Sequence, residues 1–160
     1  IFSKVPSLHL QYSPDTISAE IDKSSSDTTE IKRKYRTSGL SSDEATEITH
    51  RLEKLMLNDH VYLDSELTLS GLAVTLELST NHLSQVINSQ FHCNFYDYIN
   101  RHRVVCAKRL IENASGRHYK SLALCIDAGF KSTSTFYTAF KKETGVTPSA
   151  YQQKIDTPAA

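Results

Sequence analysis

Apolar residues recur at helical intervals from about residue 41 onward, whereas the residues before that position show no apolar periodicity. The first part of the chain is rich in Ser, Thr and charged side chains, a composition that buries too little apolar surface to offset the entropy of ordering. We therefore expect a flexible linker over residues 1–40, an accessory helix with its connection over residues 41–64, and the main folded domain over residues 65–155.

The accessory helix is predicted to begin at Ser41, because Ser41 and Glu44 have the spacing of a capping box. It extends to about Leu57, and its apolar positions are Ala45, Ile48, Leu52 and Leu55. Its outer face is acidic and comprises Asp43, Glu44, Glu47 and Glu53. An acidic face is a poor surface for DNA, so we expect this helix to pack against the domain or to form a dimer contact.

Beyond residue 67 the apolar pattern predicts a succession of helices, and strand signals almost vanish. Two apolar stripes follow one another and comprise Leu69, Leu72, Ala73 and Leu76, and then Leu83, Val86, Ile87 and Phe91. A longer helix is predicted to begin at the N-cap Asn94 and to end near residues 113–116. Its inward positions are Phe95, Tyr98, Ile99, Cys106 and Leu110.

Two more helices are predicted towards the C-terminus, each ended by a glycine. The first ends at Gly129 and is marked by Leu122, Cys125 and Ile126. The second ends at Gly145, before Pro148, and is marked by Phe136, Ala139 and Phe140. The whole pattern predicts an all-α fold of about seven helices with short connections.

A short helix, a tight turn and a second helix occur twice, and the two copies align by residue type. Ala73 lies four residues before Glu77, and Cys125 lies four residues before Gly129. A helix-turn-helix unit needs a small residue where its helices cross and a residue of positive φ in the turn. Gly129 suits that turn, whereas a left-handed conformation at Glu77 costs about 1 kcal/mol.

The second helices of both copies have outward faces of short hydrogen-bonding side chains and few acids. The first face comprises Thr80, Asn81, His82, Ser84 and Gln85, and the second comprises Thr133, Ser134, Thr135, Thr138, Lys141 and Lys142. Such side chains near a helix N-terminus can bond base edges in a major groove, and the N-cap candidates Ser79 and Ser132 can receive phosphates. The same pattern is also typical of the solvated faces of a helical bundle.

The chain has 18 Lys and Arg against 18 Asp and Glu, so its total charge favours no class of partner. The distribution is uneven, because residues 1–66 hold eight basic against twelve acidic residues and the rest of the chain holds ten against six. The basic run at residues 32–36 can be a juxtamembrane anchor, a phosphate-contacting arm or a solvated linker. The basic excess beyond residue 66 favours a nucleic-acid partner for that part.

The three cysteines show no CxxC spacing, which indicates neither a disulfide framework nor a thiolate zinc site and favours a reducing compartment. No run of about 18 apolar residues and no signal-peptide pattern occurs. The chain begins with Ile1 rather than Met, so we expect a piece of a longer protein.

Three segments together resemble the DNA-binding domain of AraC/XylS-family transcriptional regulators: residues 69–88, 94–110 and 128–151. The most specific part of the resemblance comprises Gly129, Phe130, Phe136, Phe140, Lys141, Gly145 and Pro148, supported by Arg103, Ala107 and Leu110. The resemblance implies a seven-helix domain in which a long helix joins two helix-turn-helix units that enter successive major grooves. The chain departs from the family pattern at His92, where Gly is common, at Cys125, where Ala is common, and at Glu77.

Carried over to this sequence, the resemblance implies base contacts from Asn81, Ser84, Gln85, Thr133, Ser134, Thr135 and Thr138. It implies contacts to the DNA backbone from Ser79, Thr80, His82, Arg101, Lys131, Ser132, Lys141 and Lys142, with Lys108 and Arg109 as further cations. The implied partners are double-stranded DNA, RNA polymerase and a second copy, bound through the accessory helix or through a missing sensor domain. The helix at residues 41–57 and the segment 62–69 also resemble members with a membrane-embedded or hybrid sensor, which implies a cytoplasmic domain with residues 32–36 near the inner membrane.

Other kinds of site have little support in the sequence. His102 and Cys106 have a spacing that can share a metal, but no third ligand lies near them in sequence, and we expect no metal or other cofactor. No catalytic motif occurs, so we expect no enzyme. Arg103 is expected either to contact phosphate or to brace the long helix through an ion pair with Asp127 or Glu112. The alternative function is a helical protein-interaction module without DNA binding.

Overall fold

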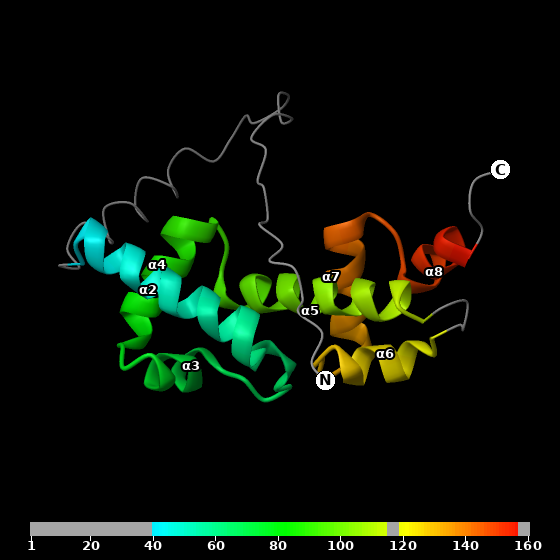
Figure 1. Cartoon of the computed structure of the whole chain (residues 1–160), viewed down its shortest axis with the longest axis horizontal. Coiled ribbons are helices and arrows are strands. Elements are labelled where there is room, and N and C mark those ends of the chain that lie inside the picture. Colours follow the sequence, from blue (N-terminus) through cyan, green and yellow to red (C-terminus); the bar gives the residue numbers. More distant parts are fainter. Residues whose placement is uncertain (1–39, 115–118, 157–160) are drawn as a thin grey trace, which may run out of the picture. The chain divides into compact units, whose positions relative to one another are not determined.

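The computed structural model describes residues 40–114 and 119–156, which form seven α-helices and two short helical turns and contain no strand (Figure 1). In chain order the elements are α2 (Ser42–Lys54), η1 (Leu55–Asp59), η2 (Val61–Leu63), α3 (Leu69–Thr75), α4 (Thr80–Phe91), α5 (Phe95–Glu112), α6 (Ser121–Asp127), α7 (Thr133–Thr144) and α8 (Pro148–Asp156). The predicted all-α fold class is confirmed. The described residues all belong to one compact unit. The predicted linker over residues 1–40 and its basic run lie almost entirely outside the described residues.

Helix α2 begins with the predicted capping box. The Ser41 hydroxyl accepts from the Glu44 amide at 3.2 Å, and the Glu44 carboxylate accepts from the Ser41 amide at 2.8 Å. After Lys54 the chain continues as the π-helical turn η1. Leu52 and Met56 are buried in one core with the residues of the helices that follow, and Arg51 donates to the carbonyl of Leu76 at 2.7 Å. The accessory helix is therefore an integral part of the first helix-turn-helix unit.

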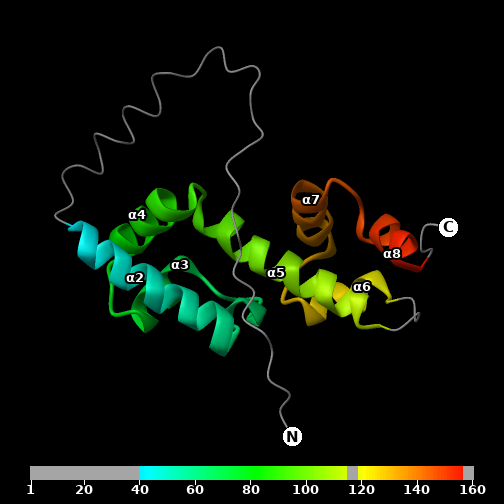
Figure 2. The ribbon, with the colours of Figure 1, turned by 45° about the horizontal axis from the view of Figure 1, so that its top comes forward.

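Each helix-turn-helix unit has its own hydrophobic core. The first core includes Leu52, Leu72, Leu83, Ile87, Tyr98 and Ile99, and the second includes Val104, Ala107, Ile111, Leu124, Phe130, Phe136 and Phe140. Helix α5 contributes residues to both cores and runs from the pair α3–α4 to the pair α6–α7 (Figure 2). The helix therefore links the two units, as predicted, because the apolar residues of each half pack into a different core.

The two turns have the same backbone hydrogen bonds. Leu78 donates to the carbonyl of Ala73 at 2.9 Å, and Phe130 donates to the carbonyl of Cys125 at 3.0 Å. The residue before each donor is left-handed, with φ of 58° at Glu77 and 82° at Gly129. Both small residues at the crossings are buried, so the predicted superposition of the two units is correct and Glu77 adopts the strained conformation.

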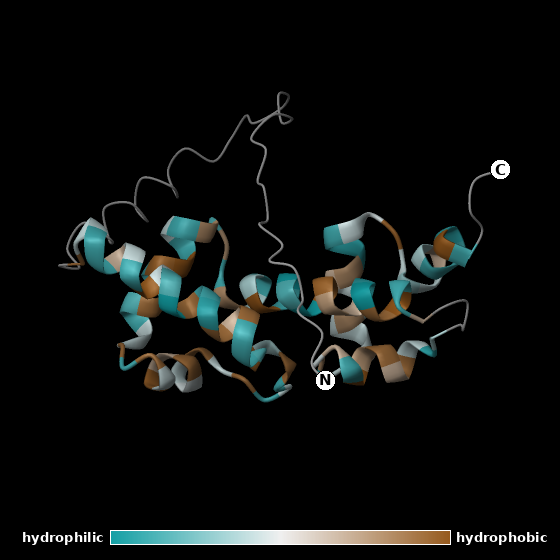
Figure 3. Ribbon diagram, viewed as in Figure 1, coloured by the Kyte–Doolittle hydropathy of each residue, from teal (hydrophilic) through white to brown (hydrophobic). Residues whose placement is uncertain are grey.

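The helix predicted before Gly129 is observed as α6, but the residues that mark it in the sequence do not all face the core. Leu122 and Ile126 are 62% and 63% exposed, whereas Leu124 and Cys125 are buried in the second core. The helix has only seven residues, so its many apolar positions do not define one face, and Figure 3 shows it as predominantly apolar. No helix within the described parts of the chain has the length and apolar character that are needed to cross a membrane.

Candidate nucleic-acid interface

Helix α4 begins at the predicted N-cap, where the Ser79 hydroxyl accepts from the amide of His82 at 3.1 Å. Thr80 and Asn81 are exposed in its first turn, and His82 is half-buried. Two further predicted base-reading residues, Ser84 and Gln85, are half-buried. The amide of Asn88 donates to the carbonyl of Ser84 at 2.8 Å, so this part of the face is already ordered within the helix. The first turn therefore presents the more accessible side chains.

Helix α7 has its predicted N-cap at Ser132, whose hydroxyl accepts from the amide of Thr135 at 3.2 Å. The two hydroxyl groups of these residues also bond each other at 2.9 Å. The structure brings all the predicted base-reading residues of this unit together as exposed side chains in the first two turns: Thr133, Ser134, Thr135 and Thr138. Because the cap satisfies only one of the free amides, the helix terminus keeps donors for an anion.

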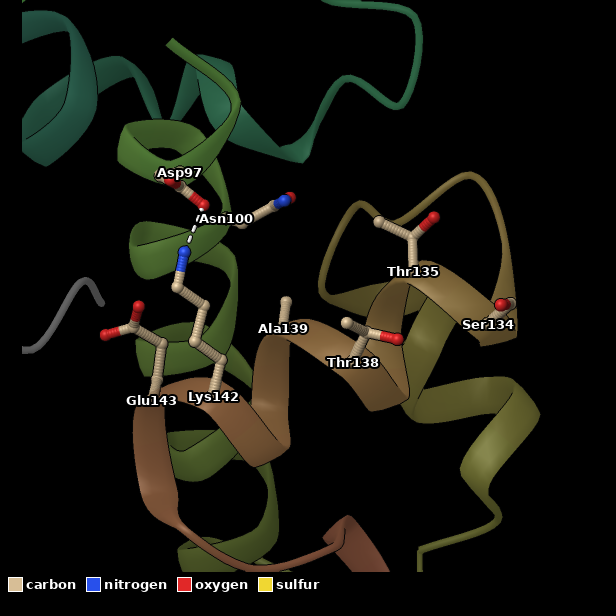
Figure 4. Close-up of a pocket in the computed structure, with 8 residues that line it drawn as sticks. All are labelled: Asp97, Asn100, Ser134, Thr135, Thr138, Ala139, Lys142 and Glu143. Carbon is tan, nitrogen blue, oxygen red and sulfur yellow. Dashed lines mark hydrogen bonds and ion pairs between the residues drawn. The ribbon is translucent and has the colours of Figure 1, made fainter. Parts of the chain in front are cut away.

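A groove of about 310 Å³ separates this face from the N-terminal half of α5 (Figure 4). Its lining from α7 comprises Ser134, Thr135, Thr138, Ala139, Lys142 and Glu143, and its lining from α5 comprises Asp97 and Asn100. Figure 4 shows the amide of Asn100 pointing toward the threonine side of the groove. Asp97, Asn100 and Glu143 were not among the predicted site residues. No sequence signal indicated them, because they reach the groove through the crossing of α5 and α7.

Three of the predicted phosphate-contacting cations form exposed ion pairs. Lys142 lies 2.8 Å from the carboxylate of Asp97, Arg101 lies 3.5 Å from Glu143, and Lys131 lies 2.7 Å from Glu66. Exposed pairs of this kind contribute about 0–1 kcal/mol, so each cation can exchange its carboxylate for a phosphate at small cost. Lys141 is also exposed and forms no ion pair with the described residues. Among the further cations, the ammonium of Lys108 lies 5.7 Å from the centre of the Tyr151 ring.

Arg103 braces the molecule, but with partners other than those predicted. It is 8% exposed, and its guanidinium donates to the carbonyls of Tyr62 at 2.7 Å and Asp64 at 2.8 Å. Burial lowers the pKa of Arg103, and the charge of Asp64 opposes that shift. The predicted ion-pair partners bond tyrosine hydroxyls instead: Asp127 accepts from Tyr119, and Glu112 accepts from Tyr151.

His102 and Cys106 lie on α5 and are half-buried. No group of three metal-ligating side chains occurs within residues 40–114 and 119–156. The imidazole of His102 stacks on the Tyr62 ring and meets the Tyr98 ring edge-on, and burial lowers its pKa to about 4. Burial likewise raises the pKa of the Cys106 thiol. Cys125 fills the predicted helix crossing and is 2% exposed.

A family model described as a helix-turn-helix domain matches residues 72–154, which is just over half of the chain. The chain belongs to the AraC-type helix-turn-helix family. In this AraC-type domain, α4 and α7 are the second helices of the two units, and α5 is the linking helix. The predicted resemblance is confirmed over nearly the same residues.

Individual proteins show how far the similarity extends. Regulatory protein PocR of Salmonella typhimurium is 26% identical over 106 residues, which make up 66% of this chain and 34% of PocR. The C-terminal domain of the two-component response regulator yesN from Fusobacterium nucleatum is 32% identical, with a TM-score of 0.54 over 64% of this chain and 98% of that domain. The DNA-binding domain of AdpA, solved with a target DNA, has a TM-score of 0.54 at 20% identity over 68% of this chain and 89% of that domain, which shows a shared fold. The AraC-type chain thus spans about a third of the length of PocR.

Proposed function

We propose that this AraC-type domain binds double-stranded DNA sequence-specifically as part of a transcriptional regulator, with α4 and α7 in successive major grooves. The observation that supports this function best is the exposed N-terminal face of α7, where four hydroxyl side chains surround a capped helix terminus. Hydroxyl and amide groups at this position can bond base edges while the remaining backbone amides receive a phosphate. The matching turn geometry of the first unit places α4 in the equivalent position within its own pair.

Within that interface we assign base contacts to Asn81, Ser84 and Gln85 of α4 and to Thr133, Ser134, Thr135 and Thr138 of α7. The backbone contacts come from the N-caps Ser79 and Ser132 and from the cations around the groove. Phosphate contacts fix the position of the protein on the duplex, and contacts to base edges give sequence preference. The groove beside α7 also contains the carboxylates of Asp97 and Glu143, which repel phosphates.

The wider assignments are also part of the proposal. RNA polymerase is the protein partner that the family implies, and DNA as the target implies a location in the bacterial cytoplasm. The apolar side of α2 is buried in the first core, with Ile48 and Leu52 at 5% and 0% exposure. We therefore assign dimerisation of the whole regulator to the acidic outer face of α2 or to segments other than this helix. The domain acts by binding alone, without catalysis or a cofactor.

The test is selection of bound duplexes from a random library at near-physiological salt, followed by two variants on the selected site. Gln85→Ala is expected to relax the preference in one half of the site by about 1–3 kcal/mol if the contact is bidentate. Lys141→Ala is expected to weaken binding to every duplex alike and to flatten the salt dependence. Binding that enriches no sequence contradicts the function, and equal losses on all sequences for Gln85→Ala contradict the assignment of that residue.

A further inference from the structure

The two helix-turn-helix units are joined by a second connection besides α5. Residues 62–66, here called the brace segment, lie between α2 and α3 in sequence and contact the turn of the second unit. Lys131, just after that turn, bonds the carboxylate of Glu66 at 2.7 Å. Arg103 of the linking helix donates to two brace carbonyls and lies 5.7 Å from the centre of the Phe130 ring. The brace, the linking helix and the second turn therefore meet at one joint.

Gly129 shows how closely the brace approaches the second turn. A Cβ at this glycine would lie 2.6 Å from Leu63 Cα, 2.7 Å from the carbonyl oxygen of Tyr62 and 2.8 Å from that of Leu63. All three atoms belong to the backbone, so no flexible side chain can move aside to make room. Gly129 thus meets two requirements at once, a positive φ for the turn and a direct backbone contact with the brace.

The brace segment is itself well ordered by local hydrogen bonds. Leu63 donates to the carbonyl of His60 at 2.9 Å, and Leu67 donates to the carbonyl of Asp64 at 3.2 Å. The Asp64 carboxylate also accepts from the amide of Glu66 at 2.9 Å. The Tyr62 side chain is buried in the first core at 7% exposure. A segment that is anchored in the first core and in contact with the second turn transmits the position of one unit to the other.

The physical consequence concerns the distance between the two recognition helices. A single helix that joins two separate cores can bend along its length, which changes the distance between them. A second connection away from the helix axis opposes such motion. Half-sites on one face of B-DNA lie about 34–36 Å apart. Each inserted base pair increases this distance and rotates one half-site about the DNA axis relative to the other.

We propose that the brace segment is a positioning element that fixes the separation of α4 and α7 and thereby restricts the domain to one half-site spacing. This inference rests on the proposed function. It assigns to residues 62–66 an effect on DNA recognition without any contact to DNA. A duplex with the same two half-sites at a different spacing then binds weakly. The reason is that the joint keeps the two recognition helices at a fixed separation, not that the base contacts differ.

The test compares Gly129→Ala with Gly145→Ala. Both glycines have a positive φ, 82° and 76°, so both substitutions strain the backbone. A Cβ at Gly145 meets nothing within 4 Å, so only Gly129→Ala displaces the brace. The measurement is the affinity of the folded 160-residue chain for duplexes that contain the selected halves with one base pair removed, none changed, and one or two added.

For the wild type and Gly145→Ala we expect affinity to fall about tenfold for a change of one base pair, since the duplex must be deformed to fit. For Gly129→Ala we expect the same change of one base pair to lower affinity about threefold or less. The displaced brace lets the two units shift to fit the altered spacing, so the duplex need not be deformed as much. Loss of stability alone lowers binding to every spacing in proportion and leaves the ratio between spacings unchanged. The ratio of affinities between spacings therefore distinguishes a role of the brace from a loss of stability.

Arg103→Lys is the second variant, in case Gly129→Ala does not fold. It keeps the positive charge but has no planar fork to donate to two carbonyls, and it should also broaden the spacing profile. An unchanged ratio in a folded Gly129→Ala or Arg103→Lys protein overturns the role of the brace, as does a wild type that binds all spacings equally. Absence of any sequence preference in the wild type instead overturns the proposed function.

Discussion

At the residue scale, His102 is the clearest case of a side chain whose chemistry is determined by its surroundings. Its ring centroid lies 5.7 Å from that of Tyr62 and 4.9 Å from that of Tyr98. No carboxylate among residues 40–114 and 119–156 offsets the effect of burial, which lowers the pKa of His102 from 6.5 to about 4. The residue is therefore neutral in the folded domain at pH values where it is charged in the unfolded chain.

We expect this difference to destabilise the domain in mild acid. Below pH 6.5 the unfolded chain binds a proton at His102 and the folded chain does not until about pH 4, so the free energy of unfolding falls as the pH falls through this window. The loss amounts to about 3 kcal/mol, at about 1.4 kcal/mol for each unit of pKa difference. Urea unfolding of the wild type and of His102→Phe between pH 7 and 4 isolates this contribution. Parallel pH profiles for the two proteins would exclude it.

Residue properties that depend on near neighbours in sequence were predictable. The capping box at Ser41 and the N-caps Ser79, Asn94 and Ser132 follow from local spacing, and all are confirmed. The partners of Arg103 were not predictable, because they are backbone carbonyls 39 and 41 positions away that belong to no recognisable charge pattern. A guanidinium can donate to a carbonyl oxygen as well as to a carboxylate. Opposite charge alone therefore indicated Asp127 and Glu112, which are not its partners.

At the scale of the element, the N-terminus of α7 has two roles that substitution can separate. The Ser132 hydroxyl caps the helix, and we propose that the same terminus receives a phosphate. Ser132→Ala is expected to lower the free energy of unfolding by about 1 kcal/mol, because it removes the cap. Ser132→Asp keeps a cap and suits the helix dipole, so we expect nearly wild-type stability together with weaker binding to every duplex.

Thermal unfolding and a salt series of DNA-binding measurements on both variants check this expectation. If Ser132→Asp binds DNA as tightly as the wild type does, no phosphate lies at this helix terminus. If both variants unfold at the wild-type temperature, the hydrogen bond to Thr135 contributes little. The two readouts are independent, since one reports on the helix and the other on its ligand.

The elements themselves were predictable to different degrees. Helices with one clear apolar face, such as α5 and α7, were expected at nearly their observed bounds. In α6 the periodicity could not distinguish Leu122 and Ile126 from the buried Leu124, because nearly every residue of this short helix is apolar. Only the packing of Cys125 and Leu124 against α7 and α5 selects the inward face. The groove beside α7 was likewise invisible in the sequence, since it depends on how two helices cross.

At the scale of the whole molecule, acidic residues around the proposed interface limit its attraction for DNA. Asp97 holds Lys142 at 2.8 Å, 45 positions away in sequence. Asp97→Asn keeps the size of the side chain and releases the cation. We expect affinity to rise about two- to fivefold for specific and unrelated duplexes alike, within the range of an exposed ion pair. The gain should shrink as salt is raised, because the interaction lies at the surface.

Glu47→Gln is the matched control for this experiment. It changes the net charge by the same amount on the exposed acidic face of α2. A general effect of net charge would raise affinity equally in both variants, whereas the local effect is confined to Asp97→Asn. Fluorescence anisotropy at several salt concentrations distinguishes the two outcomes. Equal gains in affinity for the two variants would show that Asp97 has no local effect on DNA binding.

The joint between the brace segment and the second turn also has a consequence for how the domain is made. Glu66 and Lys131 are 65 positions apart, so the brace leaves the ribosome well before its partners do. At synthesis rates of about 5–20 residues per second, roughly 3–13 s separate the two. The carbonyls of Tyr62 and Asp64 remain open to water for the first part of this interval, until Arg103 is synthesised 41 and 39 positions after them. The contact between Glu66 and Lys131, which we propose to help fix the half-site spacing, therefore forms late on the nascent chain.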